Sequence, residues 1–315
     1  HEYSYNKFLP EYEKVYRVQR NYDSNGDTLT FATVSLRLAE ALRTEIPDLE
    51  YVVESDWMGE HGLMVGDTKL FLRGAQSGSD FLKVFQYPLL QGNASTALSD
   101  PYSIVITQST ARALFGTEDA MNKMVRFDNK NDLKVTGILK DLPENSSFKI
   151  NWVVPFSYIE ANNPGVKANR AGSFGNNSYQ IFVKLKPGVT LAQVGPKVLF
   201  ITHSEKDNTN AMNSYVWLYP MKYWHLYNEF EHGQIGSGFS RYVKMFTIIG
   251  ALILLIACIN FINLTTARSE KRAREVGVRK VIGSRRHQLI GQFLTESFLL
   301  TVLSFLFSLL MVQLA

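Results

Sequence analysis

Two long apolar segments close the sequence, and a short basic segment separates them. Positions 245–264 hold 16 apolar residues of 20 and no charge, and 12 of them are Leu, Ile or Phe. At about 1.5 Å per helical residue, this segment reaches across the roughly 30 Å of hydrocarbon in a bilayer. Its apolar side chains outweigh Asn260 and Asn263 on insertion scales. We predict a transmembrane helix over 241–265; a buried core helix is the alternative.

The second apolar segment, 297–315, has 19 residues without a charge. It predicts another transmembrane helix over 289–315, which we expect to be cut short. Between the two, residues 265–288 carry a net charge of +6. Lys and Arg in short loops beside membrane spans stay in the cytoplasm. The pattern therefore predicts a cytoplasmic segment over 266–288 and an extracytoplasmic domain over 1–240.

The external part alternates between the periods of strands and helices, which is typical of an α+β domain. Strands are expected at 15–22, 51–57, 68–73, 103–108, 123–129, 133–139, 179–186 and 215–220, and helices at 5–14, 35–46, 81–87, 109–116 and 190–203. Asn25-Gly26 predicts a hairpin turn. Residues 161–178 are rich in Asn, Gly and Ser, which predicts a long exposed loop, and 179–220 would form a second lobe. Residues 233–240 are expected to be a flexible junction into the membrane.

Charge and cysteine content separate the two parts. Residues 1–242 contain 24 Lys and Arg against 26 Asp and Glu, so the basic pI of about 8.9 reports the membrane-flanking segment and not a nucleic-acid surface. The single cysteine, Cys258, lies in the first apolar segment and leaves the external domain no disulfide. The sequence begins without Met or a signal peptide. An external domain needs an export or anchor segment, so we expect an earlier span upstream.

The sequence motifs typical of catalytic, nucleotide-binding and metal sites do not identify such a site in this chain. The sequence has no G-x-x-x-x-G-K-[ST] motif, and GAQSG around Ser77 is not the G-x-S-x-G nucleophile turn. Asp56, Glu60 and His61 could meet at a metal ion, but a solvated turn is favoured. We predict no catalytic residue, no cofactor and no metal site. A membrane-tethered sensor or enzyme would need a catalytic cluster or a signalling helix, and we find neither.

The basic segment differs from a simple charged loop because its apolar residues recur at the spacing of a helix. Val278, Val281 and Ile282 fall on one side of an expected short helix, Gly283 suits its C-terminal cap, and Ser284 suits the start of the next helix. A structured elbow between the two spans is one interpretation. The other is a basic anchor resting on anionic lipid headgroups.

The run NFINLTTARSEKRAREVGVRKVIGSRRHQLIGQFLTES at 260–297 resembles the FtsX/MacB-type ABC transporter permeases. In that family, a span ending in an N-F-x-N-L-like pattern leads into an R-x-x-E-[VI]-[GA]-[IV]-R-like coupling segment. The external part resembles the family's periplasmic core domain, in its Bacteroidetes type. The matching blocks are YEKVYRV (12–18), FLKVFQYPLLQGNASTAL (81–98), SIVITQSTARALFG (103–116) and VTGILKDLPENSSF (135–148).

The resemblance implies a multi-pass inner-membrane permease subunit, whose cytoplasmic coupling helix docks on a separate ABC ATPase subunit. It implies a family unit of four spans, a second permease copy and contact with membrane lipid. The ATPase contact would be formed by Glu275, Val276, Gly277, Val278, Arg279, Lys280, Val281, Ile282 and Gly283. It implies mechanotransmission in the export of a peptide, drug or lipoprotein-like substrate. The alternative is regulation of an extracytoplasmic cell-wall hydrolase, and a periplasmic adaptor is a further implied partner.

Overall fold

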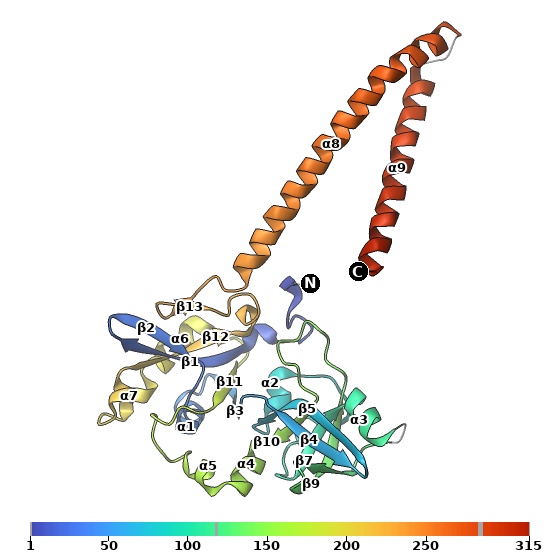
Figure 1. Cartoon of the computed structure of the whole chain (residues 1–315). Coiled ribbons are helices and arrows are strands. Elements are labelled where there is room, and N and C mark those ends of the chain that lie inside the picture. Colours follow the sequence, from blue (N-terminus) through green and yellow to red (C-terminus); the bar gives the residue numbers. More distant parts are fainter. Residues whose placement is uncertain (1, 117–118, 283–285, 315) are drawn as a thin grey trace. The chain divides into compact units, whose positions relative to one another are not determined.

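The computed structural model describes residues 2–116, 119–282 and 286–314. The chain divides into two compact units, His1–Val243 and Lys244–Ala315, which we describe separately (Figure 1). The first unit mixes strands and helices, as the sequence predicts. The second consists of two long helices.

Unit 1 contains all the described strands. They are β1 (Val15–Ser24), β2 (Asp27–Phe31), β3 (Leu49–Ser55), β4 (Glu60–Val65), β5 (Thr68–Ser77), β6 (Leu89–Gly92), β7 (Ser103–Thr107), β8 (Met124–Phe127), β9 (Asn131–Leu139), β10 (Trp152–Pro155), β11 (Gln180–Leu185), β12 (Ser214–Pro220), β13 (Phe230–Glu231) and β14 (Gln234–Ile235). Its helices are α1 (Leu36–Glu45), α2 (Phe81–Phe85), α3 (Gln108–Phe115), α4 (Phe156–Asn162), α5 (Pro164–Ala168), α6 (Leu191–Val198) and α7 (Thr209–Met212). The 3-10 helices are η1 (Glu2–Ser4), η2 (Tyr12–Lys14), η3 (Ile201–Ser204) and η4 (Met221–Tyr223).

One sheet of 12 strands runs through the unit in the order β10-β7-β9-β8-β4-β5-β3-β11-β1-β12, with β2 on β1 and β6 on β9. β11 pairs with both β1 and β3, and β12 pairs with β1. The elements of 179–220 therefore do not form a sheet of their own. All six positions of β11 are buried, as expected for a strand with neighbours on both edges. The division into two lobes remains a prediction.

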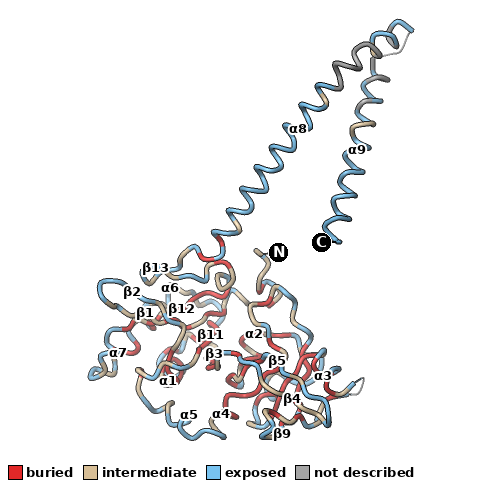
Figure 2. The backbone as a smooth tube through the Cα atoms, viewed as in Figure 1, coloured by how far each residue is buried: buried red, intermediate tan, exposed pale blue. Residues whose placement is uncertain are grey.

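The core covers both faces of this sheet, since alternate residues of β11 belong to different buried clusters, and Figure 2 shows that the buried residues gather in unit 1. α1 packs Leu38 and Leu42 onto one face, and Ser35 caps it by accepting a hydrogen bond from the Leu38 backbone N–H. On the other face, Phe81 and Phe85 of α2 meet Phe182 of β11. A third buried cluster contains Trp152 and residues of β4, β8 and β9, and a fourth, smaller one joins Leu36, Phe156 and Val166. Because these clusters draw on residues from the whole external region, no short segment carries a core of its own.

The hairpin predicted at Asn25-Gly26 is confirmed, and the strands expected at 123–129 and 133–139 pair as a second hairpin, whose turn lies at 128–130 and not at the expected 129–132. Asn25 and Gly26 have φ of 51° and 83° between β1 and β2. Asp128 and Asn129 have φ of 49° and 55° between β8 and β9. Asn and Asp tolerate this left-handed region because their short polar side chains bond locally.

The predicted long exposed loop over 161–178 is wrong in part. The segment contains α5, and Phe174 is buried in the core. Arg170 of the same segment pairs with carboxylates of α1, β3 and α4. A buried aromatic ring and an ion-pair network thus fix a segment whose Asn and Gly content is typical of a loop.

Two predicted helices also differ. Residues 5–14 form turns and η2 in place of a helix, because Pro10 interrupts the run. Residues 190–203 form α6 and then η3, separated by a break at Leu199 and Phe200. Neither change moves a strand of the sheet.

Unit 2 comprises α8 (Ser240–Val281) and α9 (Arg286–Leu314). Ser240–Ala267 and Ile290–Leu314 are apolar enough to span a membrane, with mean hydropathy of 2.6 and 2.1, and neither stretch is buried in the protein. Figure 2 shows both helices exposed along most of their described lengths, which argues against a core helix. The predicted short coupling helix is not a separate element, since residues 275–281 continue α8.

Candidate functional site

The predicted ATPase contact lies at the end of α8. Residues 275–281 form its last two turns, and the Ile282 backbone N–H donates to the Val278 carbonyl at 3.2 Å. Val278, Val281 and Ile282 are 60%, 89% and 78% exposed. Gly283, Ser284 and the side chains of Glu275, Arg279 and Lys280 lie outside the described residues. The described part therefore presents three apolar side chains that the protein itself does not cover.

The other end of α8 is tied to unit 1 by hydrogen bonds. The Ser240 backbone N–H donates to the Leu226 carbonyl at 2.7 Å, and the Phe239 N–H donates to Asn228 Oδ1 at 3.2 Å. The Arg241 guanidinium lies 3.3 Å from the Glu229 carboxylate. Ser240 itself is buried. The first turn of α8 is thus part of the external domain.

The expected flexible junction over 233–240 is therefore wrong. Gly238 has φ of +46°, and a Cβ there would lie 2.6 Å from Asn228 Oδ1. Glycine serves a close backbone approach at this point, where a side chain would clash. The hydrogen bonds of Leu226, Asn228 and Ser240 could not be predicted from the sequence, because glycine content alone does not distinguish close packing from mobility.

An ion-pair network around Arg170 joins three elements of unit 1. Arg170 lies 2.7 Å from Glu40 and 2.5 Å from Glu54, and it also pairs with Glu160. Burial alone would raise the pKa of the Glu54 carboxyl, but Arg43 and Arg170 hold that pKa below its usual value. The network joins α1, β3 and α4, so its role is structural.

A buried cation, Lys184, lies in the middle of the sheet on β11. Its ammonium group is 2.6 Å from the Glu11 carboxylate and 3.3 Å from that of Glu50. Glu11 also pairs with Lys14 at 2.6 Å. Hydrogen bonds donated by Lys14, which has the larger effect, and by Lys184 lower the pKa of the Glu11 carboxyl to about 2. Glu11 precedes η2, so this pair attaches the N-terminal segment to the sheet.

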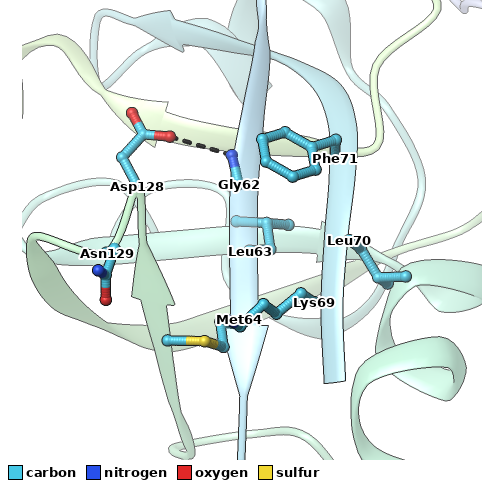
Figure 3. Close-up of a pocket in the computed structure, with 8 residues that line it drawn as sticks. All are labelled: Gly62, Leu63, Met64, Lys69, Leu70, Phe71, Asp128 and Asn129. Carbon is cyan, nitrogen blue, oxygen red and sulfur yellow. Dashed lines mark hydrogen bonds between the residues drawn. The ribbon is translucent and has the colours of Figure 1, made fainter. Parts of the chain in front are cut away.

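A shallow pocket of about 280 Å³ opens beside the β4–β5 hairpin (Figure 3). Its lining is mainly apolar, and Phe71 is 78% exposed. Asp128 accepts a hydrogen bond from the Gly62 backbone N–H at 3.0 Å. The lining residues are Gly62, Leu63, Met64, Lys69, Leu70, Phe71, Asp128 and Asn129. The pocket offers no arrangement of acid, base and nucleophile.

The residues weighed for a metal site have other partners. Asp56 Oδ1 accepts hydrogen bonds from the Met58 and Gln76 backbone N–H groups, both at 3.1 Å. His61 Nδ1 lies 2.6 Å from Asp128 Oδ2. Among the residues that the structure describes, no three His, Cys, Asp or Glu side chains are grouped to hold a metal ion.

Two family models cover most of the chain. Residues 2–198 match the MacB-like periplasmic core domain, and residues 247–315 match the FtsX-like permease C-terminal model. The first match covers more than half of the chain. The second contains the end of α8 and its exposed apolar residues.

Curated proteins are similar to this chain over much of its length. The chain is 24% identical over 208 residues to an uncharacterized ABC transporter permease, YknZ, of Bacillus subtilis, covering 63% of this chain and 45% of that protein. It is 23% identical over 239 residues to the macrolide export ATP-binding/permease protein MacB of Haemophilus ducreyi, covering 71% of this chain and 30% of MacB. The chain thus spans less than half the length of these relatives.

A solved structure has a similar fold. A domain of a putative permease protein from Porphyromonas gingivalis superimposes with a TM-score of 0.54 at 24% identity, covering 67% of this chain and 92% of that domain. This likeness concerns the fold of the external unit, and its source agrees with the Bacteroidetes-type resemblance. Taken with the two family models, it leads to one assignment: the chain belongs to the FtsX/MacB-type ABC transporter permeases.

Proposed function

We propose that this chain is a permease subunit that transmits motion from a separate ABC ATPase subunit to its external domain. The observation that carries the proposal is the continuity of α8, which has 42 residues from Ser240 to Val281 without a break. At about 1.5 Å per residue, such a helix is about 63 Å long. It connects a hydrogen-bonded base in unit 1 to the exposed apolar residues at its far end.

The base of α8 supports this mechanism because hydrogen bonds hold its first turn to the preceding segment of unit 1. Tyr219 of β12 is buried, and its hydroxyl lies 2.9 Å from the Tyr223 carbonyl oxygen and 2.7 Å from the Tyr227 carbonyl oxygen, either of which can accept its one hydrogen. The same segment supplies Leu226, whose carbonyl accepts from Ser240. A tilt of α8 would therefore move the sheet of the external domain directly.

The far end of α8 supports a protein contact. Val278 and Ile282 are one helical turn apart, so they fall on one face of the helix. Exposed apolar residues in such a row are suited to a groove on a partner protein. We place the ATPase contact on residues 275–283, in the cytoplasm, and the external domain on the other side of the inner membrane. Export of a peptide, drug or lipoprotein-like substrate, and a second permease copy, belong to the same proposal.

The test is the double substitution Val278→Asp and Ile282→Asp in the full-length protein. Two buried carboxylates without partners should weaken an apolar contact strongly. We expect the amount of co-purified ATPase to fall at least about tenfold, while the unfolding of the external domain stays unchanged. Phe71→Asp, an equal change at an equally exposed residue of unit 1, is the matched control. Unchanged ATPase recovery with the double variant would refute the contact.

A further inference from the structure

Three exposed aromatic residues belong to the two end segments of unit 1. Tyr3 is 61% exposed, Phe239 40% and Tyr242 45%. We call them the aromatic collar. Phe239 and Tyr242 flank Ser240, the first residue of the stretch that is long and apolar enough to span a membrane. Tyr3 comes from the opposite end of the unit, in η1.

His225 brings the two ends together. Its ring stacks on Tyr5 with centroids 3.3 Å apart and planes 3° apart, and it meets the Phe239 ring at 5.4 Å. His225 Nε2 also lies 2.6 Å from the Glu2 carboxylate. Tyr3 lies between Glu2 and Tyr5 in the sequence, so His225 fixes the segment that presents it.

The position of the collar relative to a membrane follows from chain connectivity alone. Phe239 precedes the span by one residue, so it lies at the membrane surface in whatever direction the domain leans. Tyr and Trp are enriched at this depth because a ring can rest among the acyl chains while its polar end meets the headgroups. Lys244, exposed on the first turns of α8, can reach lipid phosphates.

We propose that the aromatic collar is a lipid-contact surface, by which the external domain rests in the interfacial zone of the outer leaflet. His225 is its positioning residue, since it contacts Phe239 and also Glu2 and Tyr5 on either side of Tyr3. The occupant is lipid, because the collar is continuous with the lipid-facing surface of α8. Unit 1 is thereby attached to the membrane by its N-terminal segment as well as by α8.

The test uses single cysteines in the full-length protein with Cys258 replaced by Ser. Tyr3→Cys, Phe239→Cys and, as control, Phe71→Cys carry an environment-sensitive fluorophore in vesicles of phosphatidylethanolamine and phosphatidylglycerol. A nitroxide on the lipid headgroup should quench the labels at 3 and 239 at least about twofold more than the label at 71. No ATPase is present, so the outcome is independent of the proposed coupling.

A label at position 3 that is quenched no more than the label at 71 would overturn the proposal, because Tyr3 would then face water or another protein segment. A second variant tests His225. In His225→Ala we expect the label at 3 to lose its quenching while the label at 239 keeps it, and His225→Phe, which retains a ring, should restore most of it. An unchanged label at 3 in His225→Ala would remove His225 from the collar. Because position 239 adjoins the span whether or not unit 1 is folded, folding of the variant is checked by its tryptophan fluorescence, which arises in unit 1 alone.

Discussion

The two units of the chain place their apolar side chains in opposite ways. In unit 1, the large rings of Trp152, Tyr219 and Phe81 are fully buried. In unit 2, Leu254 and Ile256 of α8 are about two-thirds exposed. Unit 1 therefore buries most of its large apolar side chains among its own residues, whereas unit 2 leaves a long apolar surface that the rest of the chain does not cover.

This difference indicates which measurement is suited to each unit. Substitutions in unit 1 should change its free energy of unfolding, and those at the end of α8 should change binding. The two responses can be measured separately, because all 4 tryptophans, Trp57, Trp152, Trp217 and Trp224, lie in unit 1. Tryptophan fluorescence during denaturation thus follows the external unit alone.

The largest effect is expected from Arg170→Met. The substitution leaves the Glu54 carboxylate, only 5% exposed, with Arg43 as its single cation, and it removes the partner of Glu160. Breaking a buried ion pair on one side costs about 3 to 5 kcal/mol. We expect a loss of that size in the tryptophan-detected free energy of unfolding.

Arg126→Met is the matched control for Arg170. Arg126 pairs with Asp132 at 3.2 Å, and both side chains are exposed. Exposed pairs contribute about 0 to 1 kcal/mol. If both arginine variants lost the same small amount, the segment around Arg170 would be the mobile loop that its composition suggests, and unit 1 would be less self-sufficient than its contacts indicate.

A somewhat smaller loss is expected from Gly74→Ala. A Cβ at this position on β5 would lie 2.5 Å from the Trp152 carbonyl oxygen and closer still to its ring. β5 and β10 pair side by side there, so the backbone has little room to move. Overpacking of this kind costs about 2 to 3 kcal/mol.

Gly195→Ala tests the same change in open space. Nothing lies within 4 Å of a Cβ at Gly195 in α6, and Ala is the better helix former. We expect this variant to gain about 0.5 to 1 kcal/mol. A loss at Gly195 as large as that at Gly74 would mean that chain flexibility, and not contact with Trp152, decides the result.

The sequence predicted local structure well where one segment determines its own form. The hairpins at Asn25-Gly26 and Asp128-Asn129 depend on residues that tolerate positive φ, and α1 depends on its own apolar stripe and on Ser35. The two apolar spans were found for the same reason. Composition within about 20 residues is sufficient for all of these features.

Features that join distant segments could not be predicted. The pairing of β11 with β1 and β3 brings together strands more than 100 residues apart, and no local period specifies it. Arg170 and His225 are isolated polar residues in sequence, and only the fold gives them Glu54 and Glu2 as partners. At the end of α8, three of the residues that the family resemblance assigned to ATPase contact, Val278, Val281 and Ile282, are apolar and exposed, whereas Val276 is partly covered.

A small effect that depends on pH is expected from Glu11→Gln. Lys14 and Lys184 lower the pKa of Glu11 from 4.5 to about 2 in the folded protein. A lowered pKa stabilises the fold above the unfolded value, so this contribution is complete above about pH 4.5 and is lost as the pH falls toward 2. Because the carboxylate is nearly one-third exposed, water screens it, and we expect a loss of about 1 kcal/mol at neutral pH.

The measurement compares the two proteins at pH 7 and at pH 3 by tryptophan-detected denaturation. The other titrating carboxylates are common to both proteins, so the difference between them isolates Glu11. We expect the gap between wild type and Glu11→Gln to narrow as the pH falls. A gap that is independent of pH would show that Glu11 acts through its hydrogen bonds to Lys14, Lys184 and Gln86 whether or not it is charged. The N-terminal segment would then be attached to the sheet by shape and polarity more than by charge, which would leave the His225 contacts as its main electrostatic connection to unit 1.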